Sequence, residues 1–118
     1  MRILIVDDNV VFAQVMRRAL VEKGHDCGVV HDINDAEEAV VMNTFDVVVT
    51  DLHVHQASGL SLLERVMLLC PGALRILMSG SADADALAAG IRVSHMQLLK
   101  PFSLDALCDI LEEHERRT

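Results

Sequence analysis

The chain has 118 residues, of which 52% are hydrophobic, and it contains three Phe but no Trp or Tyr. This length suits one domain with a single core, which must be built from aliphatic side chains. A formal net charge of −8 argues against a surface that binds nucleic acid directly. No apolar run approaches a membrane span, and no signal peptide is recognisable. Three widely spaced cysteines without CxxC spacing predict free thiols and a cytoplasmic location.

The first half of the chain predicts two strands, each followed by a helix. Residues 3–6 form an apolar run that ends at Asp7-Asp8, and apolar side chains then recur at helical spacing from Phe12 to residue 20. Residues 27–30 form a short strand candidate. Asn34, with Glu37 three residues later, predicts a capping box that opens a helix to about residue 42.

The second half predicts three further strands and three helices. Residues 46–50 include three consecutive valines and read as a strand buried on both faces, which ends at Asp51. A loop follows, and then Ser58-Gly59 precedes a helix that stops before Pro71. The remaining predicted elements are a strand at residues 74–78, a short helix from a cap at Asp83 to about residue 89 with Gly90 after it, a strand at residues 96–99 and a last helix capped by Ser103.

Five strands that alternate with five helices predict parallel strands joined by helical crossovers. The predicted fold is therefore α/β, a three-layer sandwich with a five-stranded parallel sheet. We expect residues 1–118 to form one domain, which either stands alone or is cut from a longer protein.

The carboxyl ends of parallel strands lie on one edge of the sheet, where ligands bind in this class of fold. The predicted strands deliver Asp7, Asp8, Asp51, Ser79 and Lys100 to that edge. Carboxylates that lie close together repel each other unless a cation is present, and an all-oxygen ligand set favours Mg²⁺. An ammonium and a hydroxyl beside them suit a phosphoryl group, and a carboxylate can act as the nucleophile that accepts it.

Each of these residues alone also has an ordinary interpretation. An Asp after a strand is usually a turn former or a helix cap, and a pair of Asp before a helix can complement the helix dipole. His53 and His55 close to Asp51 allow a zinc site, although no further ligand lies nearby in the sequence. The combination of five polar residues at four predicted strand ends favours phosphoryl chemistry.

The chain resembles the receiver domain of two-component response regulators over nearly its whole length. The resemblance is carried by IVDDN at residues 5–9, VTDL at residues 49–52, Gly59, MSG at residues 78–80 and LKPF at residues 99–102. It implies the flavodoxin-like (CheY-like) strand order 2-1-3-4-5. It also implies a signalling domain that assists its own phosphorylation and dephosphorylation but is otherwise no enzyme.

The resemblance assigns a role to each matching residue. Asp51 would be the phosphoacceptor, and Mg²⁺ would be bound by Asp8, Asp51 and the backbone carbonyl of His53. Asp7 would act mostly through water bound to the metal.

Two residues would contact the phosphoryl group. Ser79 would donate a hydrogen bond to it, and Lys100 would pair with one of its oxygens. The Lys100–Pro101 peptide bond is a candidate for the cis form.

Four features stand out against the family pattern. Gln97 stands where the family usually has an aromatic residue, and Val54-His55 stands where it usually has a proline. The spacing between Ser79 and Lys100 predicts a fourth helix about one turn short, followed by an extended connection at residues 91–95. His53, two residues after the acceptor, is predicted to tune autodephosphorylation.

The implied partners are a sensor histidine kinase or a histidine phosphotransfer protein, and an output domain in cis or a downstream protein. A homodimer is a further option, and no membrane or nucleic acid contact is expected. A phosphatase of the haloacid-dehalogenase type is disfavoured, because Val10 stands where that family needs its second Asp. The remaining alternative is a degenerate receiver that acts as an interaction module without phosphorylation.

Overall fold

A five-stranded parallel sheet forms the centre of the molecule. The computed structural model describes residues 1–80 and 84–118. The strand order is β2-β1-β3-β6-β7, and β6 and β7 are the fourth and fifth strands of this sheet along the chain. The predicted order 2-1-3-4-5 is therefore confirmed. The strands span Arg2–Val6 (β1), Asp26–Val30 (β2), Val47–Asp51 (β3), Leu74–Ser79 (β6) and Met96–Leu99 (β7).

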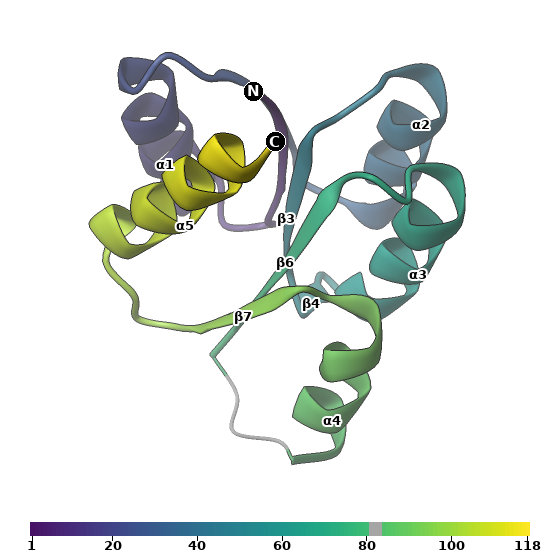
Figure 1. Ribbon diagram of the computed structural model, residues 1–118. Helices are drawn as coiled ribbons and strands as arrows, with labels where there is room; N and C mark the ends of the chain where they lie inside the picture. The colour runs from purple at the N-terminus through teal and green to yellow at the C-terminus, as the bar shows by residue number, and fades with distance from the viewer. Residues whose placement is uncertain (81–83) are drawn as a thin grey trace.

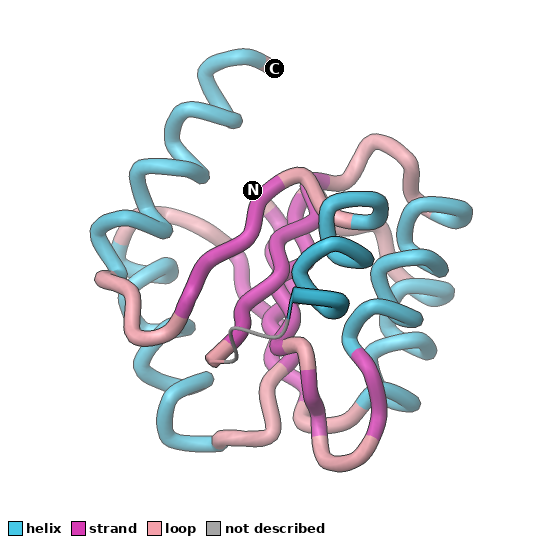
Figure 2. The backbone as a smooth tube through the Cα atoms, turned by 90° about the horizontal axis from the view of Figure 1, so that it is seen from below, coloured by secondary structure: helices cyan, strands magenta, loops and turns pink. Residues whose placement is uncertain are grey.

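Helices cover both faces of the sheet, which gives the three layers that the sequence predicts. Figure 1 shows α1 and α5 on one side and α2, α3 and α4 on the other. Figure 2 shows the strands as the layer between them. The helices span Val10–Glu22 (α1), Ile33–Met42 (α2), Gly59–Leu69 (α3), Ala84–Val93 (α4) and Leu104–Arg117 (α5). Within the described residues, no helix has both the length and the apolar character to cross a membrane.

The three valines of β3 explain why this strand lies at the centre. Val47 and Val49 pack with α1 and α5 in one core cluster, and Val48 packs with α2 and α3 in the other. All three side chains are at most 1% exposed. A strand with apolar side chains on both faces is stable only between two helical layers.

The fourth helix differs from its prediction. Helix α4 does not stop near residue 89 but continues through Gly90 to Val93, so the predicted extended connection at residues 91–95 is wrong. The position of Gly90 inside the helix requires a glycine because neighbouring side chains occupy the space that a Cβ atom would need. A Cβ atom there would lie 2.8 Å from Gln97 Nε2 and 2.8 Å from Leu77 Cδ2. The predicted cap at Asp83 lies outside the described residues.

Two smaller predictions are also corrected. Helix α2 is capped by Asp32, whose side chain accepts a hydrogen bond from the backbone N–H of Asp35, and not by Asn34. The segment after Asp51 is no plain loop, because β4 (His53–Val54) and β5 (Ala57–Ser58) form a short antiparallel hairpin. Val54, only 1% exposed, anchors the hairpin in the core.

Gly59 holds the start of α3 against the end of β3. A Cβ atom at this position would lie 2.1 Å from the carbonyl oxygen of Asp51 and 3.0 Å from Thr50 Oγ1. The backbone N–H of Gly59 donates to the carbonyl of Leu52 at 2.8 Å. Helix α3 therefore packs directly on the backbone of the residue that carries the central carboxylate.

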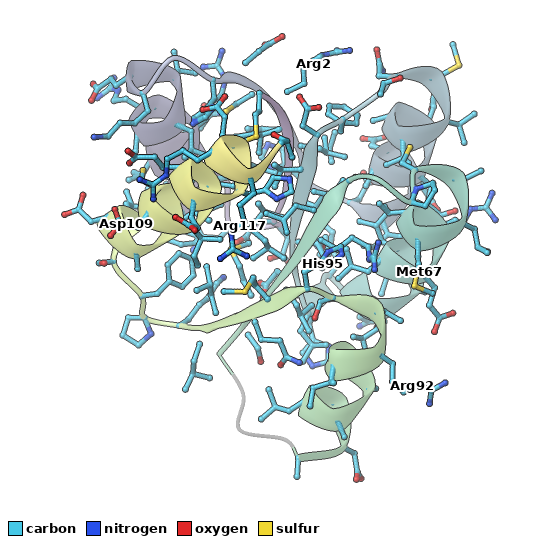
Figure 3. All side chains as sticks on the ribbon, viewed as in Figure 1. Arg2, Met67, Arg92, His95, Asp109 and Arg117 are labelled. Atoms are coloured by element: carbon cyan, nitrogen blue, oxygen red, sulfur yellow. The ribbon has the colours of Figure 1, made fainter. Side chains whose placement is uncertain are left out.

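Arg75 and His95 join α4 to the sheet at the edge opposite the carboxylates. The buried guanidinium of Arg75 donates from Nε to the carbonyl of Val93, the last residue of α4, at 2.7 Å. His95, labelled in Figure 3, accepts a hydrogen bond at Nδ1 from the backbone N–H of Arg75 at 2.9 Å. Burial, followed by the charges of Arg75 and His114, lowers the pKa of His95. The imidazole therefore serves as an acceptor in its neutral form.

We expect Gly59→Ala to lower the free energy of unfolding by about 3 kcal/mol, because the backbone of β3 or α3 must move to admit a methyl group. Chemical denaturation measures this difference. Gly72→Ala is the matched control, since no atom lies within 4 Å of a Cβ there, and its effect should stay within about 0.5 kcal/mol. Equal effects of the two substitutions would contradict the packing argument.

We expect the free energy of unfolding to fall between pH 7.5 and pH 5.5, partly because of His95. A histidine whose pKa is lowered in the folded state binds protons more readily in the unfolded chain, so stability is lost as the pH falls through the unfolded value of 6.5. His95→Asn keeps an acceptor for the Arg75 N–H but cannot be protonated, so its stability should depend less on pH. Denaturation at several pH values tests this, and His53→Asn controls for the loss of a histidine elsewhere. An unchanged pH dependence in His95→Asn would refute the role of this imidazole.

Candidate functional site

A lysine ammonium lies between two carboxylates at the carboxyl edge of the sheet. Lys100 Nζ lies 3.1 Å from Asp7 Oδ2 and 3.2 Å from Asp51 Oδ2. The Asp7 side chain is fully buried, and those of Asp51 and Lys100 are 17% and 25% exposed. The single ammonium therefore offsets part of the charge of two carboxylates that are largely removed from water.

The strands explain why these residues meet. Asp7 follows β1, Asp51 ends β3, and Lys100 follows β7, although these residues lie far apart in the sequence. Parallel pairing places Asp51 beside Met78 of β6 and places Ser79 beside Leu99 of β7. The buried Ser79 thus lies one residue beyond the position opposite Asp51, at the same edge.

Backbone groups hold the carboxylates in place. The N–H of Asn9 donates to Asp7 Oδ1 at 2.9 Å, and the N–H of Leu52 donates to Asp51 Oδ1 at 3.0 Å. Asp8 Oδ2 accepts from the N–H of His55 at 2.7 Å. His55 has φ of +56° in the turn between β4 and β5, so the hairpin turns a backbone donor toward Asp8.

The environment raises the pKa of both partners in the central pair. Burial raises the pKa of the Asp51 carboxyl, and the neighbouring charge of Asp7 adds to this, against the opposing effect of Lys100. Burial alone would lower the pKa of Lys100, but its hydrogen bond to Asp7 and the charges of Asp51 and Asp7 raise it. The lysine is therefore a permanent cation at this site.

The carboxylates fit a hard divalent cation. Asp7, Asp8 and Asp51 can each offer one oxygen, and these oxygens all lie within 4.8 Å of one another. Oxygen atoms bound to one Mg²⁺ at about 2.1 Å are at most about 4.2 Å apart, so only small side-chain shifts would bring all three into one shell. Asp8 and Asp51 are partly exposed, which leaves room for water or substrate ligands.

The histidines near the site do not complete a zinc centre. His53 is exposed on β4, and His55 Nδ1 lies 3.8 Å from Asp8 Oδ2. The only group of at least three His, Cys, Asp or Glu in residues 1–80 and 84–118 that is arranged for a metal ion is Asp7, Asp8 and Asp51. An all-carboxylate group favours Mg²⁺ or Ca²⁺ over zinc.

The structure adds residues that sequence reasoning did not assign to the site. Asn9 caps α1 and contacts Asp7, and the ring of Phe12 lies under the Lys100 ammonium at 4.7 Å from Nζ to the ring centroid. Phe102 contacts Phe12 edge to face, with 5.9 Å between ring centroids. The only sequence signal that could have pointed to Phe12 and Phe102 is that the chain contains just three Phe. The Lys100–Pro101 bond is cis, as predicted.

Comparison with known proteins places this geometry in a family. Residues 3–112 match the response regulator receiver domain. The chain is 29% identical over 113 residues to the hydrogenase transcriptional regulatory protein HoxA of Bradyrhizobium diazoefficiens, covering 94% of this chain and 23% of HoxA. It is 30% identical over 102 residues to the DNA-binding transcriptional regulator NtrC of Klebsiella pneumoniae, covering 86% of this chain and 22% of NtrC. The chain thus spans less than a quarter of the length of these two relatives.

One solved structure is similar to this chain in both fold and sequence. A response regulator protein from Burkholderia pseudomallei, crystallised with a phosphorylated aspartic acid, a calcium ion and citrate, is 27% identical, with a TM-score of 0.86. The alignment covers 91% of this chain and 64% of that one. From its sequence, its fold and its strand-end residues, this chain belongs to the response regulator receiver domain family.

Proposed function

We propose that this domain accepts a phosphoryl group on Asp51 and passes the signal to an output domain or a partner protein. The donor would be the phosphohistidine of a sensor kinase or of a histidine phosphotransfer protein. The observation that carries the proposal is the Lys100 ammonium, 3.1 Å and 3.2 Å from two carboxylates of a three-carboxylate group at the sheet edge. Together with a divalent cation bound by the carboxylates, this ammonium would offset the negative charge of an added phosphoryl group.

Asp51 is the nucleophile in this proposal. Its side chain is partly exposed, so an oxygen can reach phosphorus, while burial raises its pKa and keeps the carboxylate basic. A new P–O bond forms as the P–N bond of the donor histidine breaks, and the imidazole leaves with the bonding electron pair. The domain therefore acts in signalling and does not turn over external substrates as a conventional enzyme does.

Asp7, Asp8, Asp51 and the backbone carbonyl of His53 would hold Mg²⁺, with Asp7 acting mostly through water. The bound Mg²⁺ would supply positive charge to phosphoryl oxygens. One oxygen from each of the three carboxylates lies within 4.8 Å of the others, so small side-chain shifts would bring them into the ligand shell of one ion. His53 follows Asp51 by two residues. Lys100 would pair with a second phosphoryl oxygen, and the hydroxyl of Ser79 would donate to a third.

The output of the domain lies in the rest of a longer protein or in a separate partner. The two curated relatives are transcriptional regulators more than four times as long as the matched region, which supports a receiver at residues 1–118 joined to an output domain. A homodimer is an alternative route for the signal. The alternative of a phosphorylation-independent module makes the opposite prediction in the following experiment.

We expect the protein to gain the mass of one phosphoryl group when it is incubated with Mg²⁺ and acetyl phosphate, as measured by intact mass spectrometry. Asp51→Asn should show no adduct, since the amide is no nucleophile, and chelation of Mg²⁺ should lower the yield at least about tenfold. Asp109→Asn is the matched control, because Asp109 is exposed on α5, away from the sheet edge (Figure 3), and it should behave as the wild type. No adduct on the wild-type protein would favour the phosphorylation-independent module.

We expect His53 to set the lifetime of the phosphorylated state. Its exposed side chain lies two residues beyond Asp51, where it can influence the water that attacks the acyl phosphate. His53→Ala and His53→Asn should change the rate of adduct loss more than twofold, as followed by mass spectrometry after removal of the donor. A rate that stays within twofold of the wild type in either variant would exclude this role.

A further inference from the structure

We propose that Phe12 is a positioning residue for Lys100, whose ring face holds the lysine ammonium against the carboxylates of Asp7 and Asp51. The distance from Lys100 Nζ to the centroid of the Phe12 ring is 4.7 Å, within the range of a cation–π interaction. The kinetic consequence of this contact rests on the proposed function. The contact itself does not.

Four contacts join Phe12 and Lys100 into a closed ring. Lys100 Nζ donates to Asp7 Oδ2 at 3.1 Å, and Asp7 Oδ1 accepts from the N–H of Asn9 at 2.9 Å. Asn9 Oδ1 in turn accepts from the N–H of Phe12 at 3.0 Å, and the Phe12 ring lies under Lys100. The first turn of α1 is thus oriented by the same carboxylate that binds the lysine, so the position of the ring is coupled to the site.

Phe102 packs against the Phe12 ring and restricts its orientation. The two rings pack edge to face, with 5.9 Å between centroids and an interplanar angle of 75°. Phe102 lies two residues after Lys100 in the loop that leads to α5. The lysine and the residue that orients its aromatic neighbour are therefore carried by the same short segment.

The ring supplies something that the carboxylates do not. A lysine side chain has several rotatable bonds, and holding it in one place costs conformational entropy. Hydrogen bonds to Asp7 and Asp51 depend on direction, whereas attraction to the face of a ring tolerates small displacements of the ammonium. Phe12 can therefore stabilise Lys100 both when it contacts two carboxylates and when it turns toward a new anionic partner on Asp51. Loss of the ring should leave the ammonium disordered and more hydrated.

The test compares substitutions that keep or remove the aromatic face. Phe12→Leu keeps a large apolar side chain but no ring face, and Phe12→Tyr keeps the face. Phe45→Leu is the matched control, because the Phe45 ring forms the other cation–π pair of the described residues, with Arg2 at 5.4 Å. That pair lies at the amino-terminal edge of the sheet, because Arg2 begins β1 and Phe45 precedes β3 by two residues. Circular dichroism and thermal unfolding establish that each variant is folded.

The first measurement is independent of phosphorylation. The chain has two lysines, Lys23 and Lys100, so the lysine ε-methylene signals in a carbon–proton NMR spectrum can be assigned with Lys100→Arg. The Lys100 signal should be shifted upfield from the exposed Lys23 by the ring current of Phe12. The shift should persist in Phe12→Tyr and Phe45→Leu and should be lost in Phe12→Leu. If Phe12→Leu does not fold, Phe102→Leu, which frees the ring, should reduce the shift.

The second measurement is the rate of adduct formation with acetyl phosphate and Mg²⁺. Phe12→Leu should react about three- to tenfold more slowly, the change expected for a partly buried cation–π contact, while Phe12→Tyr and Phe45→Leu should stay near the wild-type rate. Wild-type rates in Phe12→Leu, or equal slowing in Phe12→Leu and Phe12→Tyr, would overturn the proposal. If the wild-type protein forms no adduct, the proposed function fails, and the NMR shift alone decides whether Phe12 positions Lys100.

Discussion

A buried carboxylate at the end of β1 and a second at the end of β3 share one ammonium from the end of β7, and the functional edge depends on this sharing. Without Lys100, the fully buried Asp7 and the nearby Asp51 would face each other with little solvent to screen their repulsion. The same arrangement makes the edge receptive to further charge. In the proposed function, a phosphoryl group on Asp51 would become a new partner of the lysine, so phosphorylation and a shift of Lys100 would be linked at this residue.

The rest of the fold holds the backbone around Asp51 and Lys100 in place. The valines of β3 are fixed between two apolar layers, and Gly59 lets α3 pack against the carbonyl of Asp51, so the backbone of Asp51 has little freedom. On the other side of the site, Asn9 and Phe12 tie the start of α1 to Asp7 and Lys100. A fixed Asp51 backbone that faces a flexible lysine side chain suits the proposed switch by charge.

A side-chain amide hydrogen bond joins helix α4 to β7. The side chain of Gln97, where the family usually has an aromatic residue, donates from Nε2 to the carbonyl of Leu87 at 3.0 Å. Gly90 provides the space for this amide, and Arg75 holds the last carbonyl of the helix. An amide hydrogen bond has a defined direction and breaks over a short displacement, whereas an aromatic ring can rotate between two packed positions. The coupling of α4 to the strand that leads to Lys100 therefore has a different physical basis in this chain.

The sequence alone determined the alternation of strands and helices, the family, and the set of polar residues at the strand ends. Apolar runs and helical spacing are local patterns, and Asp7, Asp8, Asp51, Ser79 and Lys100 each follow directly from the end of a predicted strand. Only the tertiary structure decided the features that depend on contacts between distant segments. Gly90 suggested a helix end, but it lies inside α4. A glycine is needed there because Gln97 and Leu77 occupy the space beside it. Phe12 looked like an ordinary core residue of an amphipathic helix, and its place under Lys100 follows from the packing of α1 against the loop after β7, which no local pattern records.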